Sequence, residues 1–320
     1  MAFLHKRFKM GEQKIDILLS TSVWNPESWV EGLSQSAQVG KIHVWPTDDD
    51  LSNVQALFVW KPLANGVIEK LSNLKWISSL GAGVDHLMTD PQVPKDTPIT
   101  RIVDPNLTAD MANYVMMGVI MHQRSFRQLQ TNQEKSNWER ITYNKLKVGV
   151  LGLGELGGHL AQQLHQAGFE VSGYSRSQKQ IEGVKCFDEN HLEAFLSDLD
   201  VLVNLLPITP KTVAILDKAF LKKTPKGCYL INVARGNHLV DEDLLALLDE
   251  GHMSGAMLDV FHQEPLPEDH PFWRHEKITV TPHVASVTSP ASALNLLKEN
   301  IERLKSGREL LHKVDVAHGY

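Results

Sequence analysis

The chain has 320 residues, 42% of them hydrophobic, and its 32 Lys and Arg against 38 Asp and Glu give a formal charge of −6. This length supports two domains with separate cores, and the charge excludes the polybasic surface that binding to nucleic acid or to an anionic membrane requires. The only cysteines, Cys186 and Cys228, lie in apolar sequence. This pattern argues against a disulfide framework or a thiolate metal site and predicts two reduced thiols and no metal.

The first 14 residues carry Lys6, Arg7, Lys9 and Lys14 and lack the continuous apolar stretch of a secretory signal. We interpret residues 1–13 as a disordered extension or, if translation begins at Met10, as mostly absent. No later segment is long enough to cross a bilayer. The sequence therefore predicts a cytoplasmic protein.

Short apolar runs separated by polar helical stretches predict a small α/β domain before residue 100, with strands at 15–19, 56–60 and 76–80. The segment 104–108 then predicts a turn and a helix cap. From Met111 to Met121 the helix is apolar nearly all round, so we expect it to be buried. It either connects two domains or packs against a second subunit.

The apolar run 148–151 flows directly into Gly152-Leu153-Gly154-Glu155-Leu156-Gly157. Gly152 permits a tight turn, Gly154 lets the backbone approach a pyrophosphate, and Gly157 allows close packing of helix on strand. The phosphates would face the positive end of the helix that begins there. The glycines thus lie in a succession of strand, turn, helix and second strand, the last at 169–174. This context favours dinucleotide binding over a merely structural glycine turn.

The residues after the second strand bear on the choice of cofactor. Enzymes that select NADH place Asp or Glu about 20 residues beyond the glycines, whereas this chain has Ser175-Arg176-Ser177. Without a carboxylate, and with a guanidinium able to bind a 2′-phosphate, the site should prefer NADPH, with NADH possible as a second cofactor. The alternative is that Arg176 is a solvated surface charge.

Further strand-like runs at 201–206, 228–233, 256–261 and 278–281 alternate with helical segments such as 241–250. This alternation predicts a parallel, doubly wound sheet. Ser289-Pro290 opens a last helix that Gly307 ends, and we expect this helix to return to the first domain. The predicted fold is α/β with two Rossmann-like or flavodoxin-like domains. A nucleotide domain, 104–286, is inserted into a discontinuous substrate domain, 1–103 plus 287–320, and ligand is expected in the cleft.

Polar residues follow three of the predicted strands. Arg235 can bind a carboxylate through two hydrogen bonds, His283 is suited to donate a proton near neutral pH, and Glu264 is a candidate partner for the imidazole. Each has an ordinary alternative as a surface charge, a packed histidine or a loop residue. Their joint placement at successive strand ends favours a catalytic site. Asp259 either braces this region or approaches the nicotinamide.

These motifs resemble the D-isomer-specific 2-hydroxyacid dehydrogenase family over nearly the whole chain after Lys14. The resemblance rests on the glycine turn and five other segments: Leu205–Thr212, Asn232–Gly236, Leu258–Phe261, Glu264–Leu266 and Thr281–Ala285. Within the family, Leu80–Asp85, Trp273 and the ending His318-Gly319-Tyr320 are similar to the bacterial glyoxylate/hydroxypyruvate reductase A group. Asn113 departs from the pattern because many relatives carry Glu there.

The resemblance implies that Arg235 holds the substrate carboxylate, that His283 is the acid/base and that Glu264 is its partner. It also implies that backbone amides around Ala82, Gly83 and Val84 bind the carboxylate, which suits a concavity of exposed N–H groups. Trp60 is a candidate pocket residue, as is Trp138, although an aromatic is more often part of a core. The implied cofactor contacts include the glycine turn with Glu155 and Leu156 and the segment Ser175, Arg176 and Ser177. The remaining implied contacts are Leu206, Pro207, Thr212, Val233, Ala234 and Asp259.

The expected reaction is NADPH-dependent reduction of a small 2-oxo acid to a 2-hydroxy acid, namely glyoxylate to glycolate or hydroxypyruvate to D-glycerate. One alternative is another enzyme of the family, acting on pyruvate, phosphoglycerate or formate. The other is a dinucleotide-sensing binding protein on the same fold. The apolar helix at 111–121 predicts a homodimer, and neither nucleic acid nor membrane is expected as a partner.

Overall fold

The computed structural model describes residues 14–22 and 24–316, which form two compact units. The terminal unit comprises the described residues within 1–104 and 288–320, and the central unit comprises residues 105–287. The interpretation of residues 1–13 and the motif His318-Gly319-Tyr320 lie outside the described residues. Within the described part of the chain, no helix is both long and apolar enough to span a membrane.

The central unit is built on a parallel sheet of seven strands in the order β12-β11-β10-β9-β6-β7-β8. The chain starts at β6 and proceeds to one side, then returns and fills the other side, so the order reverses between β6 and β9. Such a reversal is where ligands bind in open parallel sheets. The strands are β6 Lys147–Leu151, β7 Glu170–Tyr174, β8 Val184–Phe187, β9 Val201–Asn204, β10 Cys228–Asn232, β11 Met253–Leu258 and β12 Ile278–Val280.

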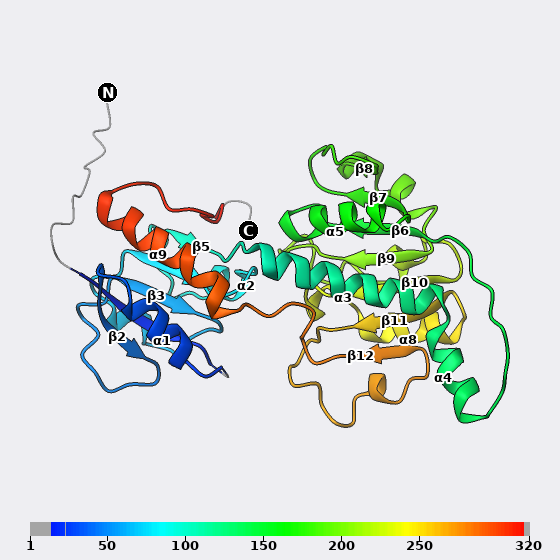
Figure 1. The fold of residues 1–320 in the computed structure, drawn as a ribbon, viewed down its shortest axis with the longest axis horizontal. Coiled ribbons are helices and arrows are strands. Elements are labelled where there is room, and N and C mark those ends of the chain that lie inside the picture. The colour runs from blue at the N-terminus through cyan, green and yellow to red at the C-terminus, as the bar shows by residue number, and fades with distance from the viewer. Residues whose placement is uncertain (1–13, 23, 317–320) are drawn as a thin grey trace. The chain divides into compact units, whose positions relative to one another are not determined.

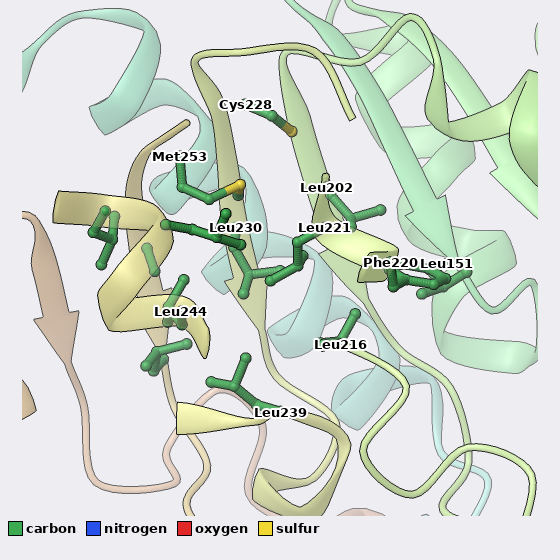
Figure 2. Close-up of a cluster of buried hydrophobic side chains, with 14 of the residues drawn as sticks. Leu151, Leu202, Leu216, Phe220, Leu221, Cys228, Leu230, Leu239, Leu244 and Met253 are labelled. Carbon is green, nitrogen blue, oxygen red and sulfur yellow. The ribbon is translucent and has the colours of Figure 1, made fainter. Parts of the chain in front are cut away.

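Helices cover both faces of this sheet because the apolar residues of its strands alternate between them. Val201 and Val203 contribute to one core, with α3 and α5, and Leu202 contributes to the other, with α6, α7 and α8. Figure 2 shows side chains of this second core, where Leu202 and Leu230 of the strands lie among residues of the covering helices. The helices are α3 Pro105–Gln123, α4 Phe126–Glu134, α5 Glu155–Gln166, α6 Leu192–Leu196, α7 Lys218–Leu221 and α8 Asp241–Asp249, with short 3-10 turns at 189–191, 236–238 and 271–273.

The terminal unit has a parallel sheet of five strands in the order β2-β1-β3-β4-β5, which reverses between β1 and β3. Both ends of the chain contribute to it: α9 packs on α1, and a Cβ at Gly32 would lie 2.1 Å from Leu294. The final helix thus belongs to the same unit as the N-terminal strands (Figure 1). The elements are β1 Ile15–Ser20, α1 Glu27–Ser34, β2 Val39–Val44, β3 Ala56–Val59, β4 Trp76–Ser79, α2 Asp85–Met88, β5 Ile99–Thr100 and α9 Pro290–Ser306, with a 3-10 turn at 68–70.

Helix α3 differs from its prediction. Met111, Val115 and Val119 are buried in the core, but Met117 and Ile120 are 44% and 43% exposed. Within one chain only one face of α3 is buried, so burial of the other face stays a prediction that depends on a second subunit. Because α3 covers only one face of the sheet, its opposite side stays uncovered by the described residues.

Candidate active site

The glycine turn lies at the point where the order of the central sheet reverses. Gly152 has φ +109°, and a Cβ there would lie 2.7 Å from the Leu205 carbonyl oxygen after β9, so only glycine fits. A Cβ at Gly157 would lie 1.8 Å from the Gly152 carbonyl oxygen. The first helical turn of α5 therefore packs directly on the end of β6.

Gly154 differs from its two neighbours because a Cβ there would meet no atom within 4 Å. It precedes Glu155, the first residue of α5, and no side chain caps that helix. Backbone amides at the start of α5 and open space over Gly154 are what a pyrophosphate group needs at a helix N-terminus. The residues present thus fit a dinucleotide.

The segment Ser175–Ser177 follows β7, the strand that pairs with β6 and places Tyr174 beside Leu151. Ser175 is buried and its hydroxyl donates to the Ser177 carbonyl at 2.7 Å, which closes a tight turn. Arg176 and Ser177 are exposed. The turn thus presents the Arg176 side chain at the carboxyl edge of the strand next to the glycine turn.

The loop after β9 contains the predicted cofactor residues Leu206, Pro207 and Thr212. Thr212 accepts from the Thr209 amide at 2.8 Å, and its hydroxyl lies 2.7 Å from the Pro207 carbonyl oxygen. Its side chain therefore shapes this loop. Leu206 and Pro207 are partly exposed and follow the strand adjacent to the glycine turn.

Arg235 directly follows Val233 and Ala234, which are buried at the end of β10. Its Nη1 donates to the Ala234 carbonyl at 2.8 Å, and the side chain is half-buried. The next residue, Gly236, packs so tightly on the following loop that a Cβ would lie 2.0 Å from the Phe261 carbonyl carbon. The Arg235 loop is thereby fixed against the loop that carries Glu264.

Glu264 and His283 form the pair expected from the sequence. His283 Nδ1 lies 2.8 Å from Glu264 Oε2, while the amide of Phe261 donates to Glu264 Oε1 at 3.1 Å. A carboxylate held in this way favours the tautomer with hydrogen on Nδ1 and fixes the orientation of the ring. The His283 side chain is 36% exposed. Because Nδ1 is engaged, Nε2 is the atom that can exchange a proton with a ligand.

A buried carboxylate holds the backbone around His283. Asp259 is fully buried, and its carboxylate accepts from the amides of Val284 at 2.9 Å and Ala285 at 2.8 Å and from the Thr281 hydroxyl at 2.7 Å. His283 itself has φ +55°, a left-handed conformation that costs energy in a residue with a Cβ. These hydrogen bonds support that conformation, so Asp259 braces the region; its approach to the nicotinamide stays a prediction.

Tyr114 extends this support and was not anticipated from the sequence. Its hydroxyl forms a very short hydrogen bond with the Thr281 hydroxyl, which in turn donates to Asp259. Burial is the main cause that raises the Tyr114 pKa above its ordinary value, so the phenol stays protonated. The contact spans 167 positions in the chain, and no local pattern signals it.

In the terminal unit, Ala82, Gly83 and Val84 follow β4 in a turn that Ser79 stabilises. The Ser79 hydroxyl donates to the Gly83 carbonyl at 2.7 Å. Ala82 and Gly83 are partly exposed, whereas Val84 is buried. Trp60, at the end of β3, packs its ring on Gly81, where a Cβ would lie 2.4 Å away. The structure thus places Trp60 beside the loop that was predicted to bind a carboxylate.

No group of three or more potential metal ligands occurs among residues 14–22 and 24–316. Cys186 and Cys228 are both free, the first half-buried and the second buried. Burial is the main cause that raises the pKa of the Cys228 thiol to about 12. Neither cysteine lies in the loops described above.

Comparison with known proteins gives consistent results. Residues 116–285 match the model for "D-isomer specific 2-hydroxyacid dehydrogenase, NAD binding domain". The glyoxylate/hydroxypyruvate reductase A of Serratia proteamaculans is 38% identical over 315 residues, which cover 96% of this chain and all of that protein.

Solved structures of similar proteins extend over the same length. A D-isomer specific 2-hydroxyacid dehydrogenase from Xanthobacter autotrophicus, in complex with NADPH and MES, superposes with a TM-score of 0.91 at 35% identity. An NADPH-dependent glyoxylate/hydroxypyruvate reductase from Sinorhizobium meliloti, in complex with NADP and sulfate, gives a TM-score of 0.90 at 35% identity. Each match covers 96% of this chain and 100% of the other.

Proposed function

Because this chain belongs to the D-isomer-specific 2-hydroxyacid dehydrogenase family, we propose that it reduces small 2-oxo acids, with glyoxylate and hydroxypyruvate as substrates and NADPH as the reductant. The observation that carries this proposal is the His283–Glu264 pair, 2.8 Å apart, together with the packing of the Glu264 loop on the Arg235 loop. A histidine paired with a carboxylate can supply a proton, and a guanidinium can bind a carboxylate; reduction of a 2-oxo acid requires both functions.

Arg235 binds the substrate carboxylate in this mechanism. Its planar guanidinium can form two parallel hydrogen bonds with the two carboxylate oxygens and so orient the keto group. The bond from Nη1 to the Ala234 carbonyl restricts the rotamers of the side chain before substrate arrives. Less conformational entropy is then lost on binding.

His283 supplies the proton. NADPH, when held over the glycine turn, would supply the hydride for the keto carbon. Protonated His283 Nε2 donates its hydrogen to the developing alkoxide oxygen. Glu264 accepts from Nδ1 throughout, which keeps the ring oriented. The buried Asp259 holds the backbone that carries the ring.

The cofactor is proposed to lie over the glycine turn. Gly152, Gly154 and Gly157, with Glu155 and Leu156 at the start of α5, would hold the pyrophosphate, and Ser175, Arg176 and Ser177 would bind the 2′-phosphate. Leu206, Pro207, Thr212, Val233, Ala234 and Asp259 would line the rest of the site. The absence of an acidic residue at the end of β7 supports NADPH over NADH.

The terminal unit is proposed as the substrate domain and the central unit as the dinucleotide-binding domain. We keep Ala82, Gly83 and Val84 as a proposed carboxylate-binding segment, supported by the partial exposure of the first two residues. Trp60 is proposed to border it because its ring packs on Gly81. The two free cysteines support a reducing compartment, so we also propose that the enzyme is cytoplasmic.

A homodimer is the proposed assembly. Six large hydrophobic side chains from α3, α4 and the segment after α4 are at least 38% exposed. We call this set the apolar surface; its members are Met117, Ile120, Phe126, Leu129, Trp138 and Tyr143. Helices α3 and α4 contact each other, which brings several of these residues into one region. Exposed apolar patches of this kind usually mark a protein interface.

The decisive experiment follows oxidation of NADPH and of NADH with glyoxylate, hydroxypyruvate and pyruvate as separate substrates. We expect the highest kcat/KM with NADPH and one of the first two acids. Turnover confined to pyruvate would shift the assignment to another enzyme of the family. Stoichiometric NADPH binding without turnover of any 2-oxo acid would contradict an enzymatic role.

A further inference from the structure

A cluster of three fully buried polar side chains lies beneath the proposed site and takes no part in the mechanism above. Asn204 ends β9, Asn232 ends β10, and His238 closes the 3-10 turn after Arg235. We call these three residues the buried amide–imidazole cluster. A fully buried polar group lowers the stability of the fold unless its hydrogen bonds are made. The partners of these three side chains therefore indicate which segments the cluster holds together.

The bonds fix how each side chain is oriented. Asn204 Nδ2 lies 3.0 Å from Asn232 Oδ1 and 3.0 Å from His238 Nδ1, so its two hydrogens serve two acceptors. Asn204 Oδ1 accepts from the Leu206 amide at 3.2 Å, so the oxygen and the nitrogen of this side chain each have matching partners. An acceptor at Nδ1 leaves the hydrogen of a neutral ring on Nε2. His238 Nε2 therefore donates to the Pro207 carbonyl at 3.3 Å.

The cluster joins two loops with different proposed tasks. On one side it holds Leu206 and Pro207, which belong to the proposed cofactor segment. On the other side Asn232 Nδ2 donates to the Arg235 carbonyl at 3.0 Å, and Asn232 Oδ1 accepts from the Ala234 amide at 3.3 Å. The backbone amides of Ala214 and Leu216 donate to the carbonyls of Asn237 and His238 and connect the two segments again farther along the chain.

We propose that His238 is a positioning residue that couples the cofactor loop to Arg235, so that NADPH binding increases the affinity of the enzyme for the substrate carboxylate. When NADPH contacts the loop at Pro207, it restrains the His238 ring and, through Asn204 and Asn232, the backbone of Arg235. A guanidinium on a restrained backbone loses less freedom when it binds a carboxylate. By linkage, a carboxylate ligand strengthens NADPH binding by the same factor.

This inference rests on the proposed role of Arg235 and is tested by binding rather than turnover. Oxamate, an unreactive analogue of a 2-oxo acid, is titrated calorimetrically into the enzyme alone and into the enzyme saturated with NADPH. For the unsubstituted enzyme we expect NADPH to tighten oxamate binding by at least about fivefold. For His238→Phe, which removes both ring hydrogen bonds, we expect this ratio to fall to about 1–2.

Three further variants separate coupling from general destabilisation. His238→Gln keeps a donor and an acceptor and should restore most of the ratio. His252→Phe removes a comparable imidazole bond, from Nε2 to the Leu221 carbonyl at 3.2 Å, and should leave the ratio unchanged even where it lowers Tm. Asn204→Ser breaks the same connection from the other end and replaces His238→Phe if that variant does not fold.

A folded His238→Phe or Asn204→Ser variant with the ratio of the unsubstituted enzyme would overturn the inference, as would a ratio of 1 in the unsubstituted enzyme. Failure of the proposed function has a different signature. It appears as absence of glyoxylate and hydroxypyruvate turnover by the unsubstituted enzyme, which is measured separately.

Discussion

At the scale of single residues, the proposed site assigns proton donation to His283 and carboxylate binding to Arg235. His283 is positioned for proton transfer by Glu264 on one side and by the buried Asp259 on the other. Arg235 is positioned by the Asn232 side chain, which donates to its carbonyl, and by the bond from its own Nη1 to the Ala234 carbonyl. Because the two residues have different proposed roles, their substitution should give different kinetic results.

His283→Ala should lower kcat by roughly 10²- to 10⁴-fold, the usual contribution of a general acid, while the affinity for NADPH measured by fluorescence titration stays near normal. His191→Ala is the matched control, because His191 is also paired with a carboxylate, at 2.6 Å, but lies on an exposed turn. Near-native turnover of His283→Ala with glyoxylate and hydroxypyruvate would contradict the assigned role.

Arg235→Ala should mainly raise KM for the 2-oxo acid, by roughly 10- to 100-fold, because hydrogen bonds to a charged group contribute about 1.5–3 kcal/mol each. Loss of transition-state stabilisation should lower kcat as well. Arg274→Ala, on an exposed segment, serves as the control. Steady-state kinetics with varied glyoxylate at saturating NADPH measure both constants, and an unchanged KM would count against the clamp.

The two cysteines should differ in reactivity. Burial raises the pKa of the Cys228 thiol to about 12, so at pH 8 almost none of it is the reactive thiolate, and the side chain is 1% exposed. Cys186 is half-buried on the edge strand β8. A disulfide reagent such as DTNB should therefore label about one thiol rapidly in the native protein and two after unfolding in guanidinium. Rapid labelling of Cys228 would show that the core around it opens.

At the scale of elements, the sequence predicts a strand most accurately where all residues of the strand are buried. The run 148–151 predicts β6 because all of Val148–Leu151 is buried between two layers of helices. Edge strands β2 and β8 were not predicted, since each is partly exposed and neither forms a continuous apolar run. β11 was predicted three residues too late: Val260 and Phe261 are buried, but the Phe261 amide bonds Glu264 instead of a strand.

The same limit applies to the site. Arg235, Glu264 and His283 could be recognised because each follows a strand at its carboxyl end, a local feature. Tyr114 and His238 could not, because their roles come from contacts 167 and 34 residues away in the chain. The periodicity of apolar and polar residues indicates which face of an element is buried. It does not indicate which buried polar side chains form hydrogen bonds with each other.

The turn after β7 is the element that should determine cofactor preference. Arg176→Ala removes the proposed partner of the 2′-phosphate, so KM for NADPH should rise by at least about tenfold, while KM for NADH changes by less than about twofold because NADH lacks that phosphate. The two constants are measured at saturating glyoxylate. An unchanged ratio of the two would identify Arg176 as an ordinary surface charge.

At the scale of the whole molecule, we expect the apolar surface to determine whether the protein forms the proposed homodimer. Trp138 is 94% exposed, and the other five members are between 38% and 52% exposed. Burying such side chains stabilises an interface by about 25 cal/mol per Å² of apolar area removed from water. One face of α3 packs on the central sheet, and the exposed residues of its opposite face would contact the second copy in the proposed homodimer.

Ile120→Asp should convert the proposed homodimer into a monomer. A carboxylate in the middle of an apolar interface loses its hydration without gaining a partner, at a cost of several kcal/mol, which would lower the association constant by at least about a thousandfold. Light scattering coupled to size exclusion gives the mass directly. Val316→Asp is the control, because Val316 is 55% exposed but lies in the terminal unit. A monomeric unsubstituted protein, or a dimeric Ile120→Asp variant, would contradict an interface on α3.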